Sequence, residues 1–312
     1  MRVLLVAKPW KGGLARYLFE ALRKRADTQA RWIATAPHST RERFQYTRHR
    51  QAWRERQIEH INTADRDLAI FVNLPPRSQD IAYSPGNVLW MTDSARANAS
   101  QLTAFSKIFA SDPGHAANLA RQAGEERFAG VLPFAMDPSI HCQTGERAAV
   151  RDVCFIGNRD PKRNPHIKAL LSAPYSATVV GNYFLRSALF WRAPHRFRPR
   201  VAIEAMAKVY SQHRISLNVH AQVVVAGTNM RTFECAGYGI PQLVENRPGL
   251  TQLFEADREI AIYDEPAELA QALSRLLADP KGATTMAEHA RHRVLQEHTY
   301  AHRIEQIFAA LP

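Results

Sequence analysis

Short apolar runs alternate with longer amphipathic segments along the whole chain. Residues 2–7 are apolar after the first position, a pattern typical of a strand buried on both faces of a parallel sheet. Between residues 14 and 25 the apolar positions recur at helical spacing, and residues 28–35 resume as a strand. The chain is therefore predicted to begin with a β-α-β unit.

The same alternation continues through both halves of the chain. In the first half, strands are predicted at residues 68–73, 87–91, 107–111 and 128–132. In the second half, strands are predicted at residues 152–157, 177–181, 215–219, 242–245 and 259–263, and helices at 165–171, 201–213, 265–277, 282–297 and 300–311. Strands that alternate with helices favour doubly wound α/β domains with parallel sheets.

The length of the chain also bears on its domain organisation. Its 312 residues exceed the usual size of a single core, so two domains of roughly 150 residues each are expected. Residues 143–151 are polar and lack an apolar period, and we place the linker there. The predicted domains are residues 1–145 and residues 152–295, both Rossmann-like.

Composition places the chain among soluble globular proteins, with 46% hydrophobic and 22% charged residues. The longest apolar runs fall short of the roughly 20 residues of a membrane span, and the first seven residues are too short for a signal peptide. We therefore expect a cytoplasmic protein. Cys142, Cys154 and Cys235 have neither an even count nor CxxC spacing, which argues against disulfides or a zinc site and favours buried small side chains.

The basic charge of the chain suggests an anionic partner. The net charge is +12 and the pI is near 10.0, values that suit a nucleic acid or an anionic membrane surface. Only 8 of the 41 basic residues are Lys, so a bias in genomic base composition explains the charge equally well. Both explanations remain open at this stage.

A polar loop followed by a helix lies at residues 227–241. Asn229 is a good N-cap, and the unpaired N–H groups of the helix start that it caps attract phosphate. Arg231 and Glu234 lie in the first turns of this helix, and Gly239 ends it. The candidate phosphate-binding residues of this stretch are Gly227, Thr228, Asn229, Met230 and Arg231, with Glu234 beside them.

A second phosphate-suited turn follows the strand at residues 152–157. Gly157 and Asn158 lead into a basic loop before the next helix. Arg159, Lys162 and Arg163 could neutralise a diphosphate there, although an ordinary charged turn has the same pattern.

Polar residues also follow strands of the first half, where ligands of open α/β sheets bind. Asp93 is a candidate general base for an acceptor hydroxyl, or alternatively the N-cap of a helix beginning near Ser94. Asp112 has the pattern of a cap and turn. The pair Gly12 and Gly13 could contact a phosphate or let an acceptor approach the backbone, although the full G-x-G-x-x-G pattern is missing.

Two segments interleave arginines with aromatic residues. Residues 41–61 form a predicted long polar helix that contains Arg48 and Trp53, and in residues 185–200 prolines predict a loop that contains Arg192 and Arg196. Such interleaving suits an anionic polymer or an interface. In the first segment the alternative is a solvated helix whose aromatic residues pack inward.

Several of these residues recur together in a known arrangement. They are Phe155-Ile156-Gly157-Asn158 with its basic continuation, Ser216-Leu217-Asn218, the stretch from Gly227 to Gly239, residues 264–269, and His298-Thr299-Tyr300 with Arg303. By these motifs, residues 152–308 resemble the C-terminal domain of CgeB-like glycosyltransferases in the GT-B group. The first half resembles them loosely, in strand order and in Trp90-Met91-Thr92-Asp93.

The resemblance implies a GT-B fold, with two Rossmann-like domains facing an interdomain cleft. It also implies that residues 296–312 form a helix packed back on the N-terminal domain. Glu234 would receive the donor ribose, and the N–H groups from Gly227 to Met230 its diphosphate. Arg159, Lys162 and Arg231 would balance the phosphate charge, which gives Arg231 a catalytic part.

The same resemblance implies an enzyme that needs neither a metal ion nor a cofactor. Its donor substrate is expected to be a UDP-sugar. No convincing D-x-D motif is present. Many retaining GT-B relatives carry a second glutamate eight positions before the Glu234 equivalent, where this chain has Ala226. Sugar contacts and a retaining outcome are therefore not carried over.

The acceptor is expected to be anionic and bound by the first domain, through Gly12, Gly13, Arg48 and Trp53, with Arg192 and Arg196 as further contacts. DNA with a hydroxylated base, such as a hydroxymethyl base, is the first hypothesis, since a DNA-modifying enzyme could reach such a base by extruding it. A glycan or glycolipid at an anionic membrane is the alternative. An inactive GT-B binding module is the alternative of another class.

Overall fold

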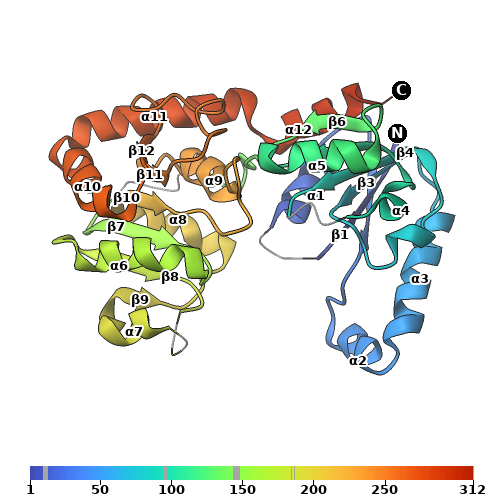
Figure 1. The fold of residues 1–312 in the computed structure, drawn as a ribbon, viewed down its shortest axis with the longest axis horizontal. Helices are drawn as coiled ribbons and strands as arrows, with labels where there is room; N and C mark the ends of the chain where they lie inside the picture. Colours follow the sequence, from blue (N-terminus) through green and yellow to red (C-terminus); the bar gives the residue numbers. More distant parts are fainter. Residues whose placement is uncertain (10–12, 94–96, 143–147, 184, 186, 312) are drawn as a thin grey trace. The chain divides into compact units, whose positions relative to one another are not determined.

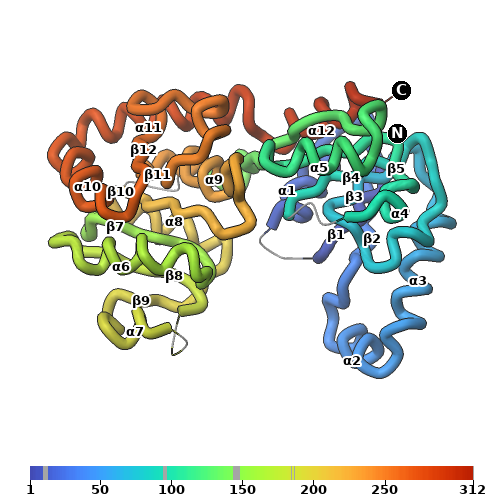
Figure 2. The backbone as a smooth tube through the Cα atoms, in the orientation of Figure 1, coloured from blue at the N-terminus to red at the C-terminus, as the bar shows by residue number. Residues whose placement is uncertain are grey.

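The computed structural model describes residues 1–9, 13–93, 97–142, 148–183, 185 and 187–311 (Figure 1). Its contacts group into unit 1, Met1–Pro133 with Tyr300–Pro312, and unit 2, Phe134–Thr299. Figure 2 traces the chain through unit 1, then unit 2, and back into unit 1 at its red C-terminal end. Residues 134–142, which we expected in the first domain, thus belong to unit 2.

The sheet of unit 1 has six parallel strands in the order β2-β1-β3-β4-β5-β6. These strands are β1 (Arg2–Ala7), β2 (Gln29–Ala34), β3 (Leu68–Val72), β4 (Ser84–Met91), β5 (Phe105–Ala110) and β6 (Phe128–Val131). All six coincide closely with predicted apolar runs. Consecutive buried residues such as Leu4, Leu5 and Val6 are what a sheet covered on both faces requires.

Helices cover the sheet of unit 1. They are α1 (Leu14–Arg23), α2 (Thr40–Arg48), α3 (Arg50–Thr63), α4 (Ala99–Leu102), α5 (Pro113–Ala123) and α12 (Tyr300–Ala309), with the 3-10 helix η1 (Ser78–Asp80). Ile58 of α3 and Leu119 of α5 pack in one core cluster with Leu4 and Phe71. The C-terminal helix α12 packs on α1, where the rings of Tyr17 and Tyr300 lie 5.6 Å apart.

The single helix that we predicted at residues 41–61 is wrong, because the chain forms two helices there. His49 separates α2 from α3 with a non-helical backbone (φ −134°, ψ 52°) and serves as the cap of both. Ser39 begins α2 with a capping box in which its hydroxyl accepts from the Glu42 N–H. Neither Gly nor Pro marks the break at His49 in the sequence, so the helical pattern alone did not reveal it.

Unit 2 contains a second six-stranded parallel sheet, in the order β12-β11-β10-β7-β8-β9. Its strands are β7 (Arg151–Ile156), β8 (Ala177–Val180), β9 (Phe197–Arg198), β10 (His213–Asn218), β11 (Gln242–Glu245) and β12 (Ala261–Tyr263). Along the chain, β7, β8 and β9 extend the sheet in one direction, and β10, β11 and β12 extend it in the other direction from β7. This is the strand order of a Rossmann fold, and the order reverses between β7 and β10.

Helices lie on both faces of this sheet. They are α6 (Asn164–Ser172), α7 (Ala188–Arg192), α8 (Ile203–Ser211), α9 (Met230–Tyr238), α10 (Leu269–Ala278) and α11 (Pro280–Glu297), with the 3-10 helices η2 (Pro161–Arg163), η3 (Pro194–Arg196) and η4 (Pro266–Glu268). Phe155 packs in one core cluster with residues of α6, α7 and α10, whereas its neighbours Cys154 and Ile156 pack with residues of α8 and α9. This alternation follows the period of two of a strand.

The loop that we predicted at residues 185–200 is only partly correct. Ser187 caps the short helix α7, and its hydroxyl accepts from the Leu189 N–H. Pro194 comes after α7 and begins η3, where proline is tolerated, so it does not disrupt the helix. Within this segment the rings of Phe190 and Phe197 pack against each other, and Phe197 also packs against Tyr183.

Hydrogen bonds fix the two places where the chain passes between units. In unit 2 the Met136 N–H donates to the His298 carbonyl at 2.9 Å, which pairs the entering and leaving segments. In unit 1 the buried Arg303 of α12 donates from Nε to the Pro133 carbonyl at 2.8 Å. Burial lowers the pKa of Arg303 to about 10. None of the described helices is long and apolar enough to cross a membrane.

Candidate functional site

The carboxyl edge of the unit 2 sheet is where a ligand is expected, because strand order reverses there between β7 and β10. The segments after both strands are the ones that the sequence singled out. Gly157 directly follows β7, and the loop from Val219 to Asn229 joins β10 to α9. The fold therefore brings the two predicted phosphate-suited turns to one edge of one sheet.

The start of α9 is organised by Asn229, as predicted. Its backbone is extended (φ −82°, ψ 167°) and its side-chain oxygen accepts from the Thr232 N–H. A second contact comes from β10, where Asn218 and Asn229 exchange side-chain hydrogen bonds of 2.9 and 3.2 Å. Asn218 also donates to the Thr232 hydroxyl, which in turn lies against the Thr228 hydroxyl. These contacts hold the loop, including Gly227 and Met230, in place at the end of β10.

Glu234 lies inside unit 2 and is only 1% exposed. Its Oε2 is 2.6 Å from Arg231 Nη1, one helical turn earlier, and its Oε1 is 3.4 Å from His141 Nε2. Burial alone would raise the pKa of Glu234, but Arg231 and His141 outweigh it and lower the pKa to about 2. Glu234 is therefore a carboxylate stabilised by the charge of Arg231 and by its contact with the His141 ring.

His141 reaches Glu234 because α9 carries a glycine on the same face. A Cβ on Gly237 would lie 2.8 Å from the His141 carbonyl oxygen and 2.5 Å from Met136 Cε, so only glycine admits this close approach. The Asp137 N–H donates to His141 Nδ1 at 2.9 Å, which places the ring proton on Nε2, toward Glu234. His141 was not predicted, because its sequence neighbourhood carries no motif.

The basic turn after β7 supplies three cations with different environments. Arg159 is exposed, and its N–H donates to the Asn182 side chain at 2.6 Å. Arg163 is largely enclosed, donates from Nε to the Val219 carbonyl and from Nη1 to the Asn158 carbonyl, and lies over the Phe155 ring. Burial lowers the pKa of Arg163. Arg163 thus ties the turn after β7 to the segment after β10, beside Gly157.

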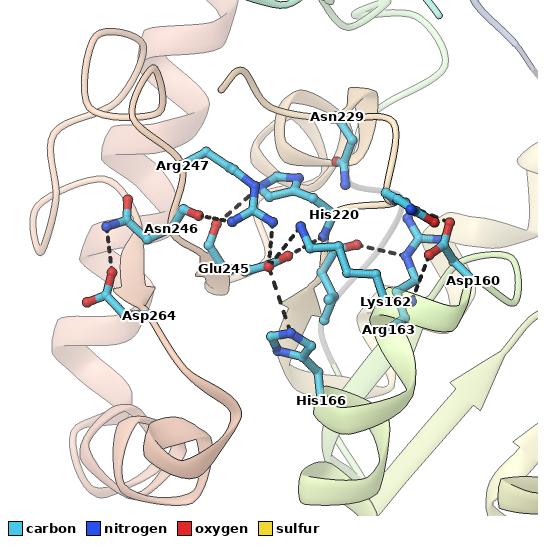
Figure 3. A network of polar contacts seen from close by, with 12 residues as sticks. Asp160, Lys162, Arg163, His166, His220, Asn229, Glu245, Asn246, Arg247 and Asp264 are labelled. Carbon is cyan, nitrogen blue, oxygen red and sulfur yellow. Dashed lines mark hydrogen bonds and ion pairs between the residues drawn. The ribbon is translucent and has the colours of Figure 1, made fainter. Parts of the chain in front are cut away.

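Lys162 contacts Glu245, a residue that the sequence analysis did not include in the site. Its Nζ lies 3.2 Å from Oε1 of Glu245, the last residue of β11 (Figure 3). Glu245 is 3% exposed and also contacts Arg247, His166 and the His220 N–H. Burial raises the pKa of Glu245, and the His220 N–H opposes this. The only signal in the sequence was a charged residue at the end of an apolar strand, which any surface strand could also show.

At the carboxyl edge of the unit 1 sheet, the described residues include a contact between Asp93 and Asn73. Asp93 follows β4 and is exposed, and Asn73, after β3, donates to its carboxylate at 3.2 Å and accepts from its N–H at 3.1 Å. Asn73 adopts the left-handed region (φ 62°), where asparagine is among the favoured residues. A helix starting near Ser94 falls outside the described residues.

Two further predictions concern unit 1. Gly13 is the N-cap of α1 with extended backbone, whereas Gly12 lies outside the described residues. Asp112 caps α5 as predicted, accepting from the Gly114 N–H.

Of the cysteines, Cys154 and Cys235 are buried as expected, and Cys142 is half-buried.

The predicted acceptor-binding residues differ in exposure. Trp53 is 5% exposed and packs edge-on against Tyr46, as in the alternative in which aromatic residues point inward, whereas Phe44 of the same segment is 59% exposed. Arg48 is exposed and stacks on the Phe44 ring. In unit 2, Arg192 is exposed beside Trp191, which is 64% exposed, whereas Arg196 is half-buried and donates to the Leu171 carbonyl.

Within the described part of the chain, no group of three or more His, Cys, Asp or Glu side chains is placed to hold a metal ion. The side chains that converge in unit 2 include the cations Lys162 and Arg163 and the amides Asn218 and Asn229, together with the carboxylate of Glu245. Cations and amides of this kind bind phosphate.

Comparison with known proteins agrees with this fold. Residues 162–309 match a family model described as glycosyl transferase-like. Among curated proteins, none matches the chain. The match is to this broad family, so the CgeB-like resemblance remains a prediction.

Solved structures resemble the chain over nearly its whole length. Sucrose-phosphate synthase (tll1590) from Thermosynechococcus elongatus is 13% identical with a TM-score of 0.71, over 99% of this chain and 98% of that one. Anabaena Alr3699/HepE in complex with UDP is 13% identical with a TM-score of 0.70, over 100% and 99%. WaaG, a glycosyltransferase involved in lipopolysaccharide biosynthesis, is 14% identical with a TM-score of 0.66, over 99% of both chains. The chain therefore has the GT-B fold, with two parallel-sheet Rossmann-like domains, and its residues 162–309 carry the signature of a glycosyl transferase-like domain.

Proposed function

We propose that the protein is a glycosyltransferase that moves a sugar from a nucleoside diphosphate sugar onto an acceptor hydroxyl. The observation that carries the proposal is the convergence of two phosphate-suited features, the capped start of α9 and the basic turn after β7, at one edge of the unit 2 sheet. The family match of residues 162–309 supports the same reaction class.

A UDP-sugar is the proposed donor. Alr3699/HepE, which shares the fold, was solved with UDP and with UDP-glucose. In our proposal the N–H groups at the start of α9 receive the diphosphate of the donor and Glu234 its ribose. Glu234 is 1% exposed beside Arg231 and His141, so donor binding requires its carboxylate to become accessible to the ribose.

The chemistry then requires stabilisation of the leaving group and removal of a proton. The acceptor oxygen forms a bond to the anomeric carbon as the bond from that carbon to the diphosphate breaks. Arg159, Lys162 and Arg231 balance the charge of the departing nucleoside diphosphate, which is the electrostatic help that this step needs. Asp93, exposed and oriented by Asn73, takes the proton of the acceptor hydroxyl.

The donor proposal is tested with a panel of UDP, GDP, ADP and dTDP sugars, by calorimetric titration and by release of the free nucleotide. We expect one nucleotide to bind and to be released, and Glu234→Ala to weaken its binding at least tenfold. Glu259→Ala, which removes another buried carboxylate of unit 2, is the control for general loss of structure. An inactive binding module would give no turnover with any sugar. Unchanged nucleotide affinity in Glu234→Ala would contradict the proposed donor site.

For the acceptor we propose an anionic polymer, with DNA bearing a hydroxylated base as the first candidate. The observation that favours it is the set of exposed arginines on α2 and α3, namely Arg41, Arg43, Arg48, Arg50 and Arg56. Exposed arginines of this number suit a phosphate backbone. Binding to duplex DNA should weaken steeply as salt rises, and DNA binding that is absent or insensitive to salt would contradict this acceptor.

The second candidate is a glycolipid or envelope glycan at an anionic membrane. It is favoured by Trp191 and Leu185, which are 64% and 55% exposed, beside the exposed Arg192. Sedimentation with vesicles containing anionic lipid, in the same salt series, separates this candidate from DNA. Retention by vesicles without DNA binding would select it.

A further inference from the structure

Glu245 is a buried carboxylate that joins three segments at the carboxyl edge of the unit 2 sheet. Its Oε2 accepts from the His220 N–H at 2.8 Å, after β10. Its Oε1 is 2.6 Å from Arg247 Nη2, after β11, and 3.2 Å from Lys162 Nζ, after β7 (Figure 3). A carboxylate with a side chain only 4% exposed needs such partners to remain charged.

The two cations on Glu245 are held differently. Arg247 is anchored at a second point, because its Nη1 donates to the Asn246 carbonyl at 2.6 Å, and its side chain is 17% exposed. The Lys162 side chain is 30% exposed and carries its ammonium on a flexible four-carbon stem. Lys162 is therefore the partner that can exchange, whereas Arg247 stays with Glu245.

The surroundings of Glu245 are suited to such an exchange. If Lys162 leaves, Oε1 keeps Arg247 and Oε2 keeps the His220 N–H, so the carboxylate is not left alone in the interior. His166 Nε2 lies 3.8 Å from Oε1, and its other ring nitrogen contacts the Tyr263 hydroxyl at 2.9 Å. These contacts hold Glu245 in place independently of Lys162.

We propose that Glu245 is a positioning residue that holds Lys162 in the ligand-free site and competes with the diphosphate for its ammonium group. This inference rests on the proposed function, since it assumes that the diphosphate binds at this edge. The competition weakens the hold of the site on the nucleoside diphosphate product, because each phosphate contact of Lys162 costs it the contact with Glu245.

The test compares UDP binding to wild type, Glu245→Gln, Lys162→Ala and the double variant, by calorimetry at low salt. Glutamine keeps the size of the side chain and an oxygen for the His220 N–H. Glu245→Gln should tighten UDP binding about fivefold, a change typical of one partly exposed charge pair. In the Lys162→Ala background the same substitution should change UDP affinity less than about twofold. UMP, which has one phosphate fewer, should gain less than UDP.

Glu259→Gln is the matched control. The Glu259 side chain is 6% exposed and pairs with Arg293 at 3.0 Å, on another part of unit 2. It should leave UDP affinity unchanged. If Glu245→Gln destabilises the protein too much to be measured, Glu245→Asp, which draws the carboxylate back from Lys162, should tighten UDP binding in the same direction by a smaller factor.

The outcomes separate the two proposals. Weaker or unchanged UDP binding in Glu245→Gln, or tightening that persists without Lys162, overturns the competition while leaving a nucleotide site intact. Should wild type bind UDP no better than inorganic phosphate, and no other nucleoside diphosphate better, the proposed function fails and this inference with it.

Discussion

The carboxyl edges of the two parallel sheets use the same backbone architecture for different chemistry. In unit 2 the ends of β7, β10 and β11 bring together Lys162, Arg163, Asn229 and Glu245, whose side chains contact one another or the neighbouring backbone. In unit 1 the ends of β3 and β4 present Asn73 and the exposed Asp93.

This difference is the basis of the division of labour that we propose. A site that binds a charged, well-defined group such as a diphosphate benefits from cations already held in place, because fewer side chains then have to be ordered on binding. A site that removes a proton needs one oriented carboxylate in contact with solvent or acceptor. The following predictions test whether the two edges differ in this way.

The largest effect on turnover is expected at Asp93. Asp93→Ala should reduce sugar transfer at least about 100-fold, the usual contribution of a general base, while changing UDP affinity less than about twofold. The measurement is product formation at saturating donor, together with a UDP titration. Asp112→Ala, which removes the N-cap of α5, is the control and should cost about 1 kcal/mol of stability without this loss of turnover. Retained transfer in Asp93→Ala would leave unit 1 without its proposed chemical role.

The next prediction concerns stability, and it distinguishes the segment around Trp53 in unit 1 from the segment around Trp191 in unit 2. Trp53→Ala should destabilise unit 1 by about 4 kcal/mol, since the ring is 5% exposed and removing it leaves a cavity. Trp191→Ala should change stability by less than about 0.5 kcal/mol because its ring is 64% exposed. Thermal unfolding measures both. If Trp191→Ala loses binding to vesicles or DNA while Trp53→Ala keeps it, the α7 segment belongs to the acceptor surface. Unchanged binding in Trp191→Ala would exclude the α7 segment from that surface.

A smaller effect on stability than that of Trp53→Ala is expected in its pH dependence, at the two buried glutamates of unit 2. Arg231 and His141 overcome the effect of burial and lower the pKa of Glu234 to about 2, so its stabilising contribution is present above about pH 4.5 and is lost as pH falls toward 2. Burial raises the pKa of Glu245, so its carboxylate disfavours folding as pH rises through the raised value. Glu234→Gln should therefore flatten the acid side of the stability–pH curve by on the order of 3 kcal/mol.

Glu245→Gln should instead leave the acid side unchanged and remove a decrease in stability just above pH 4.5. Urea unfolding at a series of pH values from 3 to 8 measures both curves. Identical curves for the two variants would show that the two carboxylates have the same environment, contrary to the structure.

Local features of the site could be predicted from the sequence. Asn229 caps α9 and Gly239 ends it at φ 66° because both roles depend on residues within a turn of one another. All strands of the unit 1 sheet and five strands of the unit 2 sheet were predicted within a few residues, since full burial on two faces leaves continuous apolar runs. The two-residue strand β9 was missed, because it lies in the segment predicted as a loop. The break at His49 was missed because neither Gly nor Pro marks it.

The remaining features depend on contacts between distant parts of the chain. The surroundings of Glu245 combine segments after three strands, and no short stretch of sequence records that combination. His141 reaches Glu234 only because Gly237, on another segment, leaves room for its backbone. The interleaving of arginine with aromatic residues looks the same around Trp53 and Trp191, and only packing made one ring buried and the other exposed.

The sequence by itself determined the two α/β domains, the helix start at Asn229 and the basic turn after Gly157, because propensity, apolar period and capping act over a few residues. Tertiary structure alone decided which charges neutralise which. Lys162 was predicted as a phosphate ligand, and in the folded chain its ammonium lies on Glu245. The physical reason is that the attraction between two charges weakens with the distance between them. Which charges pair therefore depends on which strand ends the sheet brings together.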